Sequence, residues 1–554
     1  MTNQAPQGES LNPRLWLNSD EVPPGFWQRD LEHWRLPVTP MTADLRIGTY
    51  GLLGQRRARE EFALLTPPAN LKVIDGYVYR GSPSAQDTPS PERIAAYEER
   101  VRGSHDRVVL RRWQKEVRPS IVRRLQDFHT RDLTILTDGE LTEHFRALDA
   151  YLLEWYAAHY INNHARGLLL GRCMSFCREH LDLQGTDFLE LLAGASPASS
   201  DPVTVMEELA AEGRRTPGIV EALNTADPWS EPLVWEFFQP YLQAYGCRAL
   251  ELEYAVPTLE EQPHRLMQLL RDAMARLAAG QVGAVEKVRS QREATVQDLK
   301  RKLSDDAKEE FDRLLSDAQA AYGARDDEKG LLASTDGLMR YVLLEAGRRL
   351  AQRGLLTTAE RVFFLWRREM EECMSGHPLK GLAQRAEARS QEHRRHQAMQ
   401  APFSLGVRPA PPSRPSFSQD VREAIEASKL AFDPPRRSTE LHEEYLGGQL
   451  HGQGASAGTY VGPARIVLTE AELDGVQPGD VLVCPATTPA WSLVFGKIGA
   501  LVTDTGSILS HPAITAREFG IPAVVATRTA TKVVRDGQTV WVDGKAGIVD
   551  LWRT

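Results

Sequence analysis

The stretch of residues 500–525, ALVTDTGSILSHPAITAREFGIPAVV, constrains the fold more than any other part of this chain. Its apolar ends are typical of two buried strands, and the segment between them predicts a turn at Gly506 followed by a short helix. The helix should begin near His511 and Pro512, because proline suits a first turn in which its missing N–H would have no partner. Gly520 suits the left-handed conformation that ends many helices. The stretch therefore predicts a strand, a turn, a helix and a second strand.

His511 gives this stretch its chemistry. Unpaired backbone N–H groups and the positive end of the helix dipole favour an anion at a helix N-terminus. An imidazole with an unperturbed pKa of ~6.5 is partly neutral near neutral pH and attacks phosphorus as a free base. We therefore expect His511 to carry a phosphoryl group, with Arg517 as a counter-charge. Taken alone, these residues leave open the alternative that His511 only caps the helix.

The pattern around His511 also points to a known family. Gly506-x-x-x-Ser510-His511, followed by AREFGIPAVV, resembles the signature of the phosphohistidine swivelling domain, the mobile domain of phosphoenolpyruvate-utilising enzymes. In that family the histidine accepts phosphate at one site and its domain rotates to deliver it at another. The resemblance implies this catalytic role for His511 and supporting roles for Gly506, Ser507, Ser510 and Arg517. The sequence departs from the family's usual glycine, threonine and alanine at Ser507, Leu509 and Pro512.

Length and composition narrow the class of protein. At ~150 residues per domain, 554 residues predict three or four domain-sized units. The 66 basic and 75 acidic residues give no electrostatic footprint for nucleic acid. The first residues lack a basic-then-apolar signal segment, and no apolar run approaches the ~20 residues that span a bilayer. We expect a soluble cytoplasmic protein without a membrane partner, whose five scattered cysteines are reduced thiols.

Residues 23–400 predict a mainly helical region. Long runs with helical spacing of apolar residues include 139–180 and 282–322, and a polar stretch at 324–330, ARDDEKG, lies before a further helix that ends at Gly354. A small hairpin is expected at 71–81, as a local feature. Three segments occur in an order that resembles the helical substrate domain of rifampin phosphotransferases: LLAGASPASSDPVTVMEELA, YGCRALELEYAVPTLEEQP and LLEAGRRLAQRGLLTTAERVFFLW.

Four residues of this region are candidates for substrate or phosphate contacts, namely His159, Arg248, Arg325 and Arg340. The alternative is that the arginines pair with carboxylates inside the helical bundle, or that they lie on solvated faces of helices. His159 and His164 lie five residues apart, which is not the helical spacing of a zinc pair, so no metal site is expected. Cys247 replaces a histidine of the family, which leaves an acid–base role there unsupported.

The chain should therefore be multidomain, with a mainly α-helical N-terminal substrate domain and a small β/α swivelling phosphohistidine domain. The expected parts are a flexible N-terminus at 1–22, the helical domain at 23–400, a connector at 401–446 and the swivelling domain at 447–554. Five prolines at 401–417 predict a stiff, extended tether for a domain that moves. The loop at 488–491 should lie near His511.

No segment resembles the ATP-grasp domain of rifampin phosphotransferase and phosphoenolpyruvate synthase, and no G-x-x-x-x-G-K-[ST] pattern is present. The resemblance then implies that an ATP-grasp partner, as in phenylphosphate synthase, uses ATP and Mg²⁺ to phosphorylate His511. The expected function is a phosphotransferase, or kinase, that transfers this group to a small organic substrate in the helical domain. Two alternatives stay open: a condensation or dehydration enzyme that is activated by phosphorylation, and a non-catalytic phosphocarrier or interaction module.

Overall fold

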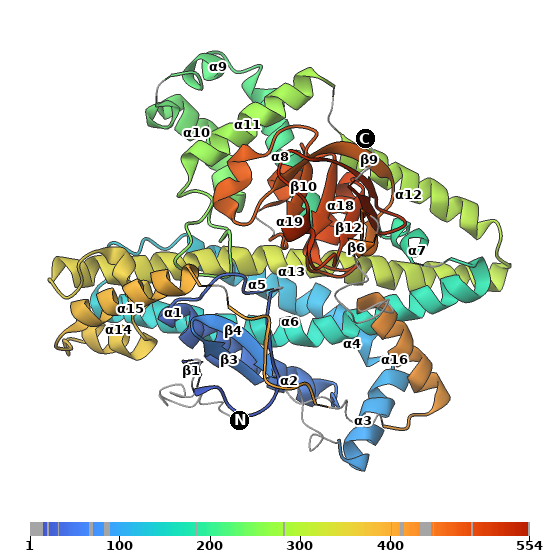
Figure 1. Ribbon diagram of the computed structural model, residues 1–554, viewed down its shortest axis with the longest axis horizontal. Helices are drawn as coiled ribbons and strands as arrows, with labels where there is room; N and C mark the ends of the chain where they lie inside the picture. Colours follow the sequence, from blue (N-terminus) through green and yellow to red (C-terminus); the bar gives the residue numbers. More distant parts are fainter. Residues whose placement is uncertain are drawn as a thin grey trace. The chain divides into compact units, whose positions relative to one another are not determined.

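The structure is a computed structural model and describes residues 15–18, 21–31, 33–65, 70–81, 89–183, 185–225, 227–280, 283–399, 401–409, 415–432, 445–446, 448–488 and 491–551. These residues are mostly helical and include two mixed sheets (Figure 1). The chain forms two compact units. Unit 1 comprises Met1–His164, Leu252–Val256 and Thr335–Ser418, and unit 2 comprises Ala165–Glu251, Pro257–Ser334 and Gln419–Thr554. The fold confirms a mainly helical chain with a smaller β/α part, whereas the expected domain boundaries stay predictions.

Unit 1 contains a five-stranded sheet in the order β1-β3-β4-β2-β5. Its strands are β1 Trp16–Leu17, β2 Trp27–Arg29, β3 Asn70–Ile74, β4 Tyr77–Gly81 and β5 Ser404–Leu405. The expected hairpin forms between β3 and β4, since Asp75 and Gly76 adopt the φ angles of 47° and 76° that a two-residue hairpin turn requires. The hairpin is the centre of this sheet rather than a local feature. Within residues 1–22, expected to be flexible, β1 pairs in parallel with β3.

Helical residues of unit 1 pack against this sheet. Buried residues of β3, β4 and the first helices form a shared core: Val38, Ala43, Ile47, Val73 and Val78. The helices of unit 1 are α1 Pro40–Thr42, η2 Ala43–Gly51, α2 Leu52–Glu61, α3 Pro91–Arg102, α4 His105–Arg112, η3 Trp113–Val117, α5 Arg118–His129, η6 Ala359–Phe364, α14 Arg367–Met374 and α15 Leu382–Gln397.

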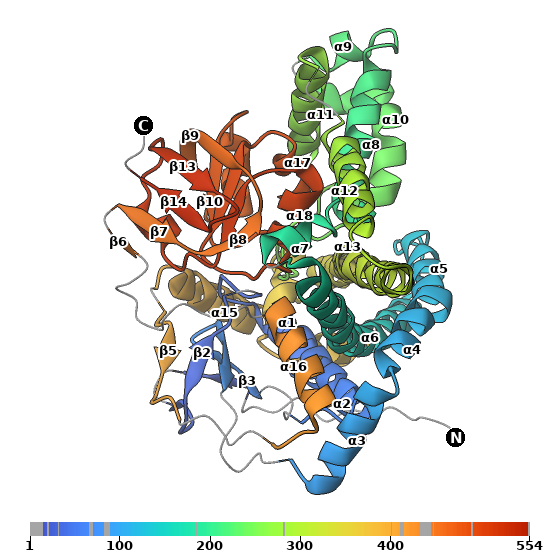
Figure 2. The same cartoon turned by 90° about the vertical axis from the view of Figure 1, so that its right-hand side faces the viewer.

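Two long helices, α6 Asp138–Leu181 and α13 Asp305–Gln352, contribute residues to both units. They lie side by side in both views (Figures 1 and 2), and Arg166 Nε on α6 donates to the Ala321 carbonyl oxygen on α13 at 3.0 Å. A reciprocal cap begins α6, because the Glu140 carboxylate accepts the Thr137 N–H at 2.8 Å while the Thr137 hydroxyl accepts the Glu140 N–H at 3.3 Å. The long helix expected at 139–180 is confirmed.

The helix α13 differs from the sequence expectation. It runs without a break through the polar stretch 324–330, which was expected to lie between two helical segments. The reason is that this stretch faces other elements of unit 2 rather than solvent. Glu328 is fully buried and accepts from Arg166 Nη2 at 3.0 Å, so its charge is paired inside the protein.

Unit 2 contains a nine-stranded sheet in the order β6-β7-β14-β13-β9-β10-β11-β12-β8. Its strands are β6 Tyr445–Leu446, β7 Gln449–His451, β8 Gln453–Ser456, β9 Thr459–Ile466, β10 Val481–Cys484, β11 Ala500–Thr503, β12 Ala523–Val525, β13 Thr539–Asp543 and β14 Ile548–Asp550. The strands β9, β10, β11 and β12 pair in parallel, and the other pairs are antiparallel. Every residue of β10, β11 and β12 is buried, which explains why all of them except Thr503 are apolar.

The helix α18, His511–Phe519, connects β11 to β12 as the sequence predicted. It contacts β8 and β12 as well as the helices α8 and α12 (Figure 2). The other helices of unit 2 are α7 Thr186–Glu190, α8 Pro197–Gly213, α9 Ile219–Ala222, η4 Pro228–Ser230, α10 Pro232–Tyr241, η5 Leu242–Gly246, α11 Pro263–Ala278, α12 Ala284–Lys300, α16 Gln419–Phe432, η7 Glu470–Gly475, α17 Ser492–Phe495 and α19 Ala530–Val533.

The expected connector is not extended throughout. Residues 410–414 and 433–444 of it lie outside the described residues, but α16 lies between them. Val421 and Ala427 of α16 are buried, and the backbone of Ala427 lies so close to Gly171 on α6 that a Cβ there would be 2.6 Å from it. Apolar packing on α6 therefore explains this helix.

Among the described residues, no helix combines the length and the apolar character that crossing a membrane requires.

Candidate active site

The loop before His511 is a tight turn. Gly506 has a φ of +116°, and a Cβ at this position would lie 2.8 Å from the Ser510 hydroxyl, so only glycine fits without strain. The carbonyl oxygen of Ser507 accepts both the Ser510 N–H at 2.9 Å and the Ser510 hydroxyl at 2.7 Å. Ser510 is the N-cap residue of α18, and His511 is the first helical residue. The loop residues selected from the sequence thus fix the backbone on which His511 stands.

The imidazole of His511 is buried, with 2% of its surface exposed. Its Nδ1 lies 3.2 Å from Oδ2 of Asp326 on α13. The Thr515 hydroxyl, one turn further along α18, lies 3.3 Å from Nδ1 and 3.4 Å from Nε2. Ser199 on α8 donates its hydroxyl to the same carboxylate oxygen of Asp326. The ring is therefore held between α18, α13 and α8 inside unit 2.

The charge of Asp326 sets the state of this ring. Burial raises the pKa of Asp326, but attraction and hydrogen bonding to His511, the charge of Lys329 and the bond from Ser199 outweigh it and lower this pKa to about 2. The carboxylate is thus anionic at neutral pH and accepts a proton-bearing Nδ1. The tautomer assigned by this hydrogen bond leaves a lone pair on Nε2.

Two charged residues of α18 hold the helix in place. Arg517 donates to the carbonyl oxygens of Ala455 and Ile508 and, through Nε, to the Tyr322 hydroxyl at 3.2 Å. It therefore supports the loop before His511. The Glu518 carboxylate accepts the N–H groups of Gly194 at 3.0 Å and Ser196 at 3.2 Å.

Burial raises the pKa of Glu518 to about 7, although those two N–H groups favour the charged form. A pKa raised this far makes the contact of Glu518 with these N–H groups sensitive to pH.

Apolar packing closes the site. Ile508, Leu509 and Ile514 are buried in one cluster with residues of α6, α7, α12 and α13. Burying one such side chain stabilises by about 1.5–3 kcal/mol relative to full exposure. Separating α18 and the loop before it from α6, α7, α12 and α13 therefore costs several kcal/mol unless new contacts replace these.

The four predicted contact residues are divided between the units. Arg248 and Arg325 belong to unit 2, but within its described residues His511 makes no hydrogen bond or ion pair with either. The Arg248 guanidinium lies 4.6 Å from the Tyr245 ring centroid, and burial lowers its pKa. Arg325 is buried and precedes Asp326 on α13. Their contact with substrate or phosphate stays a prediction.

The other two belong to unit 1. Arg340 Nη1 donates to the Tyr254 carbonyl oxygen at 2.7 Å, and its guanidinium lies 5.1 Å from the Phe363 ring centroid. His159 stacks on Trp155 with ring centroids 5.1 Å apart and lies 3.0 Å from the amide nitrogen of Asn163. The described residues contain no group of three or more His, Cys, Asp or Glu that could hold a metal ion.

The loop at 488–491 is described in part. Pro489 and Ala490 lie outside the described residues. The Thr488 hydroxyl donates to the Leu250 carbonyl oxygen at 2.7 Å, and Trp491 is buried. Proximity of this loop to His511 stays a prediction.

Sequence reasoning missed Asp326, Ser199, Thr515 and Glu518. Thr515 could have been predicted from the sequence, because it follows His511 by four residues and residues four apart on a helix share a face. Asp326 and Ser199 come from helices far away in the sequence, and only the charged residues inside an apolar helical pattern hinted that 324–330 is buried.

Comparison with known proteins shows which proteins the chain resembles around this site. Residues 476–547 match the mobile domain of PEP-utilising enzymes. Residues 159–326 match the fourth domain of rifampicin phosphotransferases. These matches confirm the resemblance inferred from the residues around His511 and from the helical region.

Individual relatives extend beyond these two domains. An uncharacterized phosphotransferase of Bacillus subtilis, YvkC, is 27% identical over 97% of this chain and 63% of its own length. A rifampicin phosphotransferase of a Streptomyces species is 29% identical over 66% of this chain and 39% of its own length. The prodigiosin synthesizing transferase PigC of Serratia marcescens is 27% identical over 78% of this chain and 48% of its own length. The chain thus spans less than two thirds of each of these proteins.

Proposed function

We propose that His511 carries a phosphoryl group from an ATP-grasp domain to a small organic substrate, so that the chain works as part of a phosphotransferase. The observation that carries this proposal is the buried ring of His511 at the start of α18, with Nδ1 3.2 Å from the Asp326 carboxylate. The two matched domains support it, because relatives that align with them include proteins named phosphotransferase.

The chemistry requires two displacements at phosphorus. In the first, the Nε2 lone pair of His511 forms an N–P bond while the P–O bond of the donor breaks. In the second, a hydroxyl oxygen of the substrate attacks phosphorus, the N–P bond breaks, and the hydroxyl proton passes to a base. In the arrangement described above, Asp326 holds the Nδ1–H and fixes the ring plane. Since the ring is 2% exposed there, we infer that α18 separates from α8 and α13 during the cycle.

The phosphoryl donor is ATP with Mg²⁺, held by an ATP-grasp domain. The sequence suggested that this domain is a separate subunit. The comparisons do not support a separate subunit, because related rifampicin phosphotransferases are single chains. We therefore propose that an ATP-grasp domain supplies the phosphoryl group. The experiment allows for both arrangements, a domain joined to this chain and a domain on a separate protein.

Intact-protein mass spectrometry at alkaline pH, where phosphohistidine survives, tests the proposal. The chain is incubated with ATP and Mg²⁺, with and without cell extract that supplies the ATP-grasp protein. We expect one phosphate-sized mass gain in the presence of extract, its loss in His511→Ala, and its retention in His377→Ala, a control at an exposed histidine. A gain that persists in His511→Ala would contradict the assignment, as would the absence of any gain in the wild-type chain.

One relative favours a second candidate. The name of the Serratia protein describes a synthesizing transferase, which fits a reaction in which phosphorylation activates a substrate for condensation. Product analysis distinguishes the two: a phosphotransferase leaves phosphate on the organic product, whereas a condensing enzyme releases inorganic phosphate with each product molecule. A histidine that is phosphorylated without either product would indicate a phosphocarrier or interaction module.

A further inference from the structure

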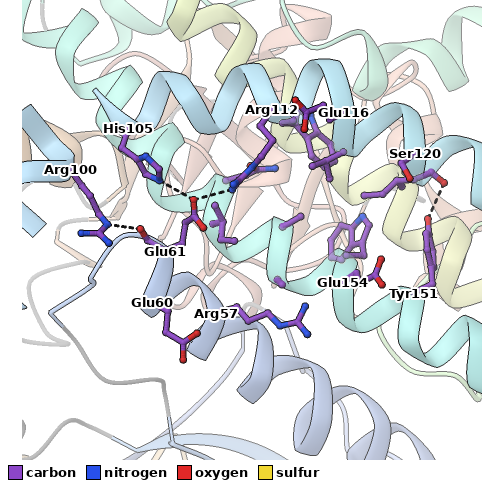
Figure 3. Close-up of a pocket in the computed structure, with 18 of the residues that line it drawn as sticks. Arg57, Glu60, Glu61, Arg100, His105, Arg112, Glu116, Ser120, Tyr151 and Glu154 are labelled. Atoms are coloured by element: carbon purple, nitrogen blue, oxygen red, sulfur yellow. Dashed lines mark hydrogen bonds and ion pairs between the residues drawn. The ribbon is translucent and has the colours of Figure 1, made fainter. Parts of the chain in front are cut away.

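Unit 1 contains a cavity of about 1250 Å³ that the proposed phosphoryl transfer does not use. Its lining comes from α2, α3, α4, η3, α5 and α6 (Figure 3), and every lining residue belongs to unit 1. Pockets for small organic molecules commonly measure ~300–1,000 Å³. Among the described residues that line it, none is one of the four contact candidates selected from the sequence.

The wall of the cavity includes buried aromatic side chains. Trp113, Tyr151 and Trp155 line it and are each 2% exposed or less. The indole N–H of Trp155 has no hydrogen-bond partner among the described residues, although the side chain is 1% exposed. A buried donor without an acceptor is unfavourable, so a ligand that brings an acceptor to this N–H gains affinity from it.

The basic groups of the cavity are mostly engaged. Glu61 Oε1 lies 2.9 Å from His105 Nε2 and 3.2 Å from Arg112 Nη2, and Figure 3 shows these side chains pointing toward one another. Arg100 donates to the carbonyl oxygens of Glu61 at 2.6 Å and of Ala96 at 3.0 Å. The Arg124 guanidinium pairs with the Glu154 carboxylate at 2.5 Å.

Among the charged side chains of the lining that have no ion pair, carboxylates outnumber cations. Within the described residues, the side chains of Glu60, Glu99 and Glu116 make no hydrogen bond or ion pair, and Arg57 is the one guanidinium of the lining in the same state. The free charge of the lining is therefore negative, because these three carboxylates outnumber the two guanidinium groups without a carboxylate partner, Arg57 and Arg100. Together with the aromatic wall, this charge favours a cation, because a protonated amine is attracted both by carboxylates and by aromatic faces.

We propose that this cavity binds an organic cation, a molecule with a planar ring system, a protonated amine and a hydrogen-bond acceptor. The rings pack on Trp113 and Trp155, the amine lies near Glu60 and Glu116, and the acceptor receives the Trp155 N–H. The further step, that this organic cation is also the molecule that accepts the phosphoryl group, rests on the proposed function. As a binding site the cavity stands by itself.

Binding of a matched set of fluorescent probes to the full chain tests the charge preference. The probes are an acridine carboxamide with a dimethylaminoethyl group, its neutral butyl analogue and its anionic carboxyethyl analogue, which share the ring and the carbonyl acceptor. We expect the cation to bind about tenfold more tightly than the neutral probe, and the anion to bind least. Equal affinity for the three probes, or tighter binding of the anion, would overturn the proposal.

Variants locate the binding. The double variant Glu60→Gln with Glu116→Gln should lower the affinity for the cationic probe about five- to tenfold and leave the affinity for the neutral probe unchanged. The reason is that these substitutions remove only charge. Trp155→Phe, which keeps a ring but removes the N–H, should weaken both probes a few-fold. Glu143→Gln, at an exposed carboxylate of α6 outside the cavity, is the matched control and should change neither.

Unchanged binding of the cation to the double glutamine variant would place the probe elsewhere and sink the proposal. His511→Ala should bind all three probes like the wild type. A chain that binds the cation but is never phosphorylated refutes only the proposed function, and a chain that is phosphorylated but shows no charge preference refutes only the cavity assignment.

Discussion

At the scale of single residues, the contact with Asp326 determines which nitrogen of His511 carries the proton. A neutral histidine can carry its proton on either ring nitrogen, and the 3.2 Å approach of an anionic carboxylate to Nδ1 favours the proton on Nδ1. A histidine without such a partner behaves differently. The half-buried ring of His164 packs against Phe62 and Tyr97, and its Nε2, which is shielded from solvent, has no hydrogen-bond partner among the described residues.

His164 should make unit 1 sensitive to acid. Burial lowers its pKa to about 4, whereas the unfolded chain has ~6.5. Between these values the unfolded state binds more protons than the folded state, so stability is full above pH 6.5 and falls as the pH drops toward 4. We expect a loss of about 2 kcal/mol between pH 7 and 5 from this group. Urea unfolding of the wild type and of His164→Phe checks this.

The phenylalanine variant should lose less stability than the wild type over that interval. Parallel losses in the two proteins would show that His164 is not the group responsible. Glu518 has the opposite sign, because its pKa is raised to about 7 and stability from its neutral form is lost as the pH rises from about 4.5 toward 7.

At the scale of elements, α6 shows how a glycine decides which helix packs where. Gly171 faces the backbone of α16, and a Cβ at this position would lie 2.6 Å from atoms of Ala427 and Ser428. Gly139, on the first turn of the same helix, has no atom within 4 Å of an added Cβ. The two glycines therefore lie on the same helix but differ in how closely other residues pack against them.

Gly171→Ala should loosen α16, because the added methyl group forces the two helices apart at a cost of about 1–3 kcal/mol. Gly139→Ala should leave α16 unchanged and stabilise α6 by about 0.5 kcal/mol through helix propensity. Amide hydrogen exchange of residues 419–432 measures the effect. Equal exchange of this segment in both variants would contradict the close contact between α6 and α16.

At the scale of the whole molecule, unit 2 is built from three stretches of chain, and its active-site candidate needs all three. Ser199 comes from the first stretch, Asp326 from the second and His511 from the third. Negative charge added at position 511 would face the anionic Asp326 in a buried setting. Such a pair is destabilising, because like charges of low solvation repel.

His511→Glu should therefore weaken the attachment of α18 to α13 and α8. We expect amide hydrogen exchange in residues 511–519 and 197–203 to become about tenfold faster, which corresponds to about 1.4 kcal/mol of lost local stability. Adding Asp326→Asn to the same chain should restore most of the protection. His377→Glu, at an exposed position, is the control and should have no effect. Failure of the second substitution to restore protection would show that repulsion from Asp326 is not the cause.

The sequence by itself determined the local features. The strand, turn, helix and strand at 500–525, the hairpin at Asp75-Gly76 and the long helix α6 are all confirmed. Each depends on forces that act over a few residues: glycine at positive φ, capping at Thr137, proline in a first turn, and apolar periodicity. The likeness to the mobile domain rested on such a local pattern and is confirmed as well.

Tertiary structure alone decided the partners of that pattern. Asp326 lies 185 residues before His511, and nothing local to either residue brings them together. Their contact follows from the packing of α18 and its preceding loop on α13, which buries apolar side chains from distant segments. Other long-range contacts keep α13 helical through 324–330, where Glu328 pairs with Arg166 of α6, and turn part of the connector into α16, which packs on α6. Periodicity predicts an element, but the burial of its faces against others decides its neighbours, because apolar attraction has no directional preference.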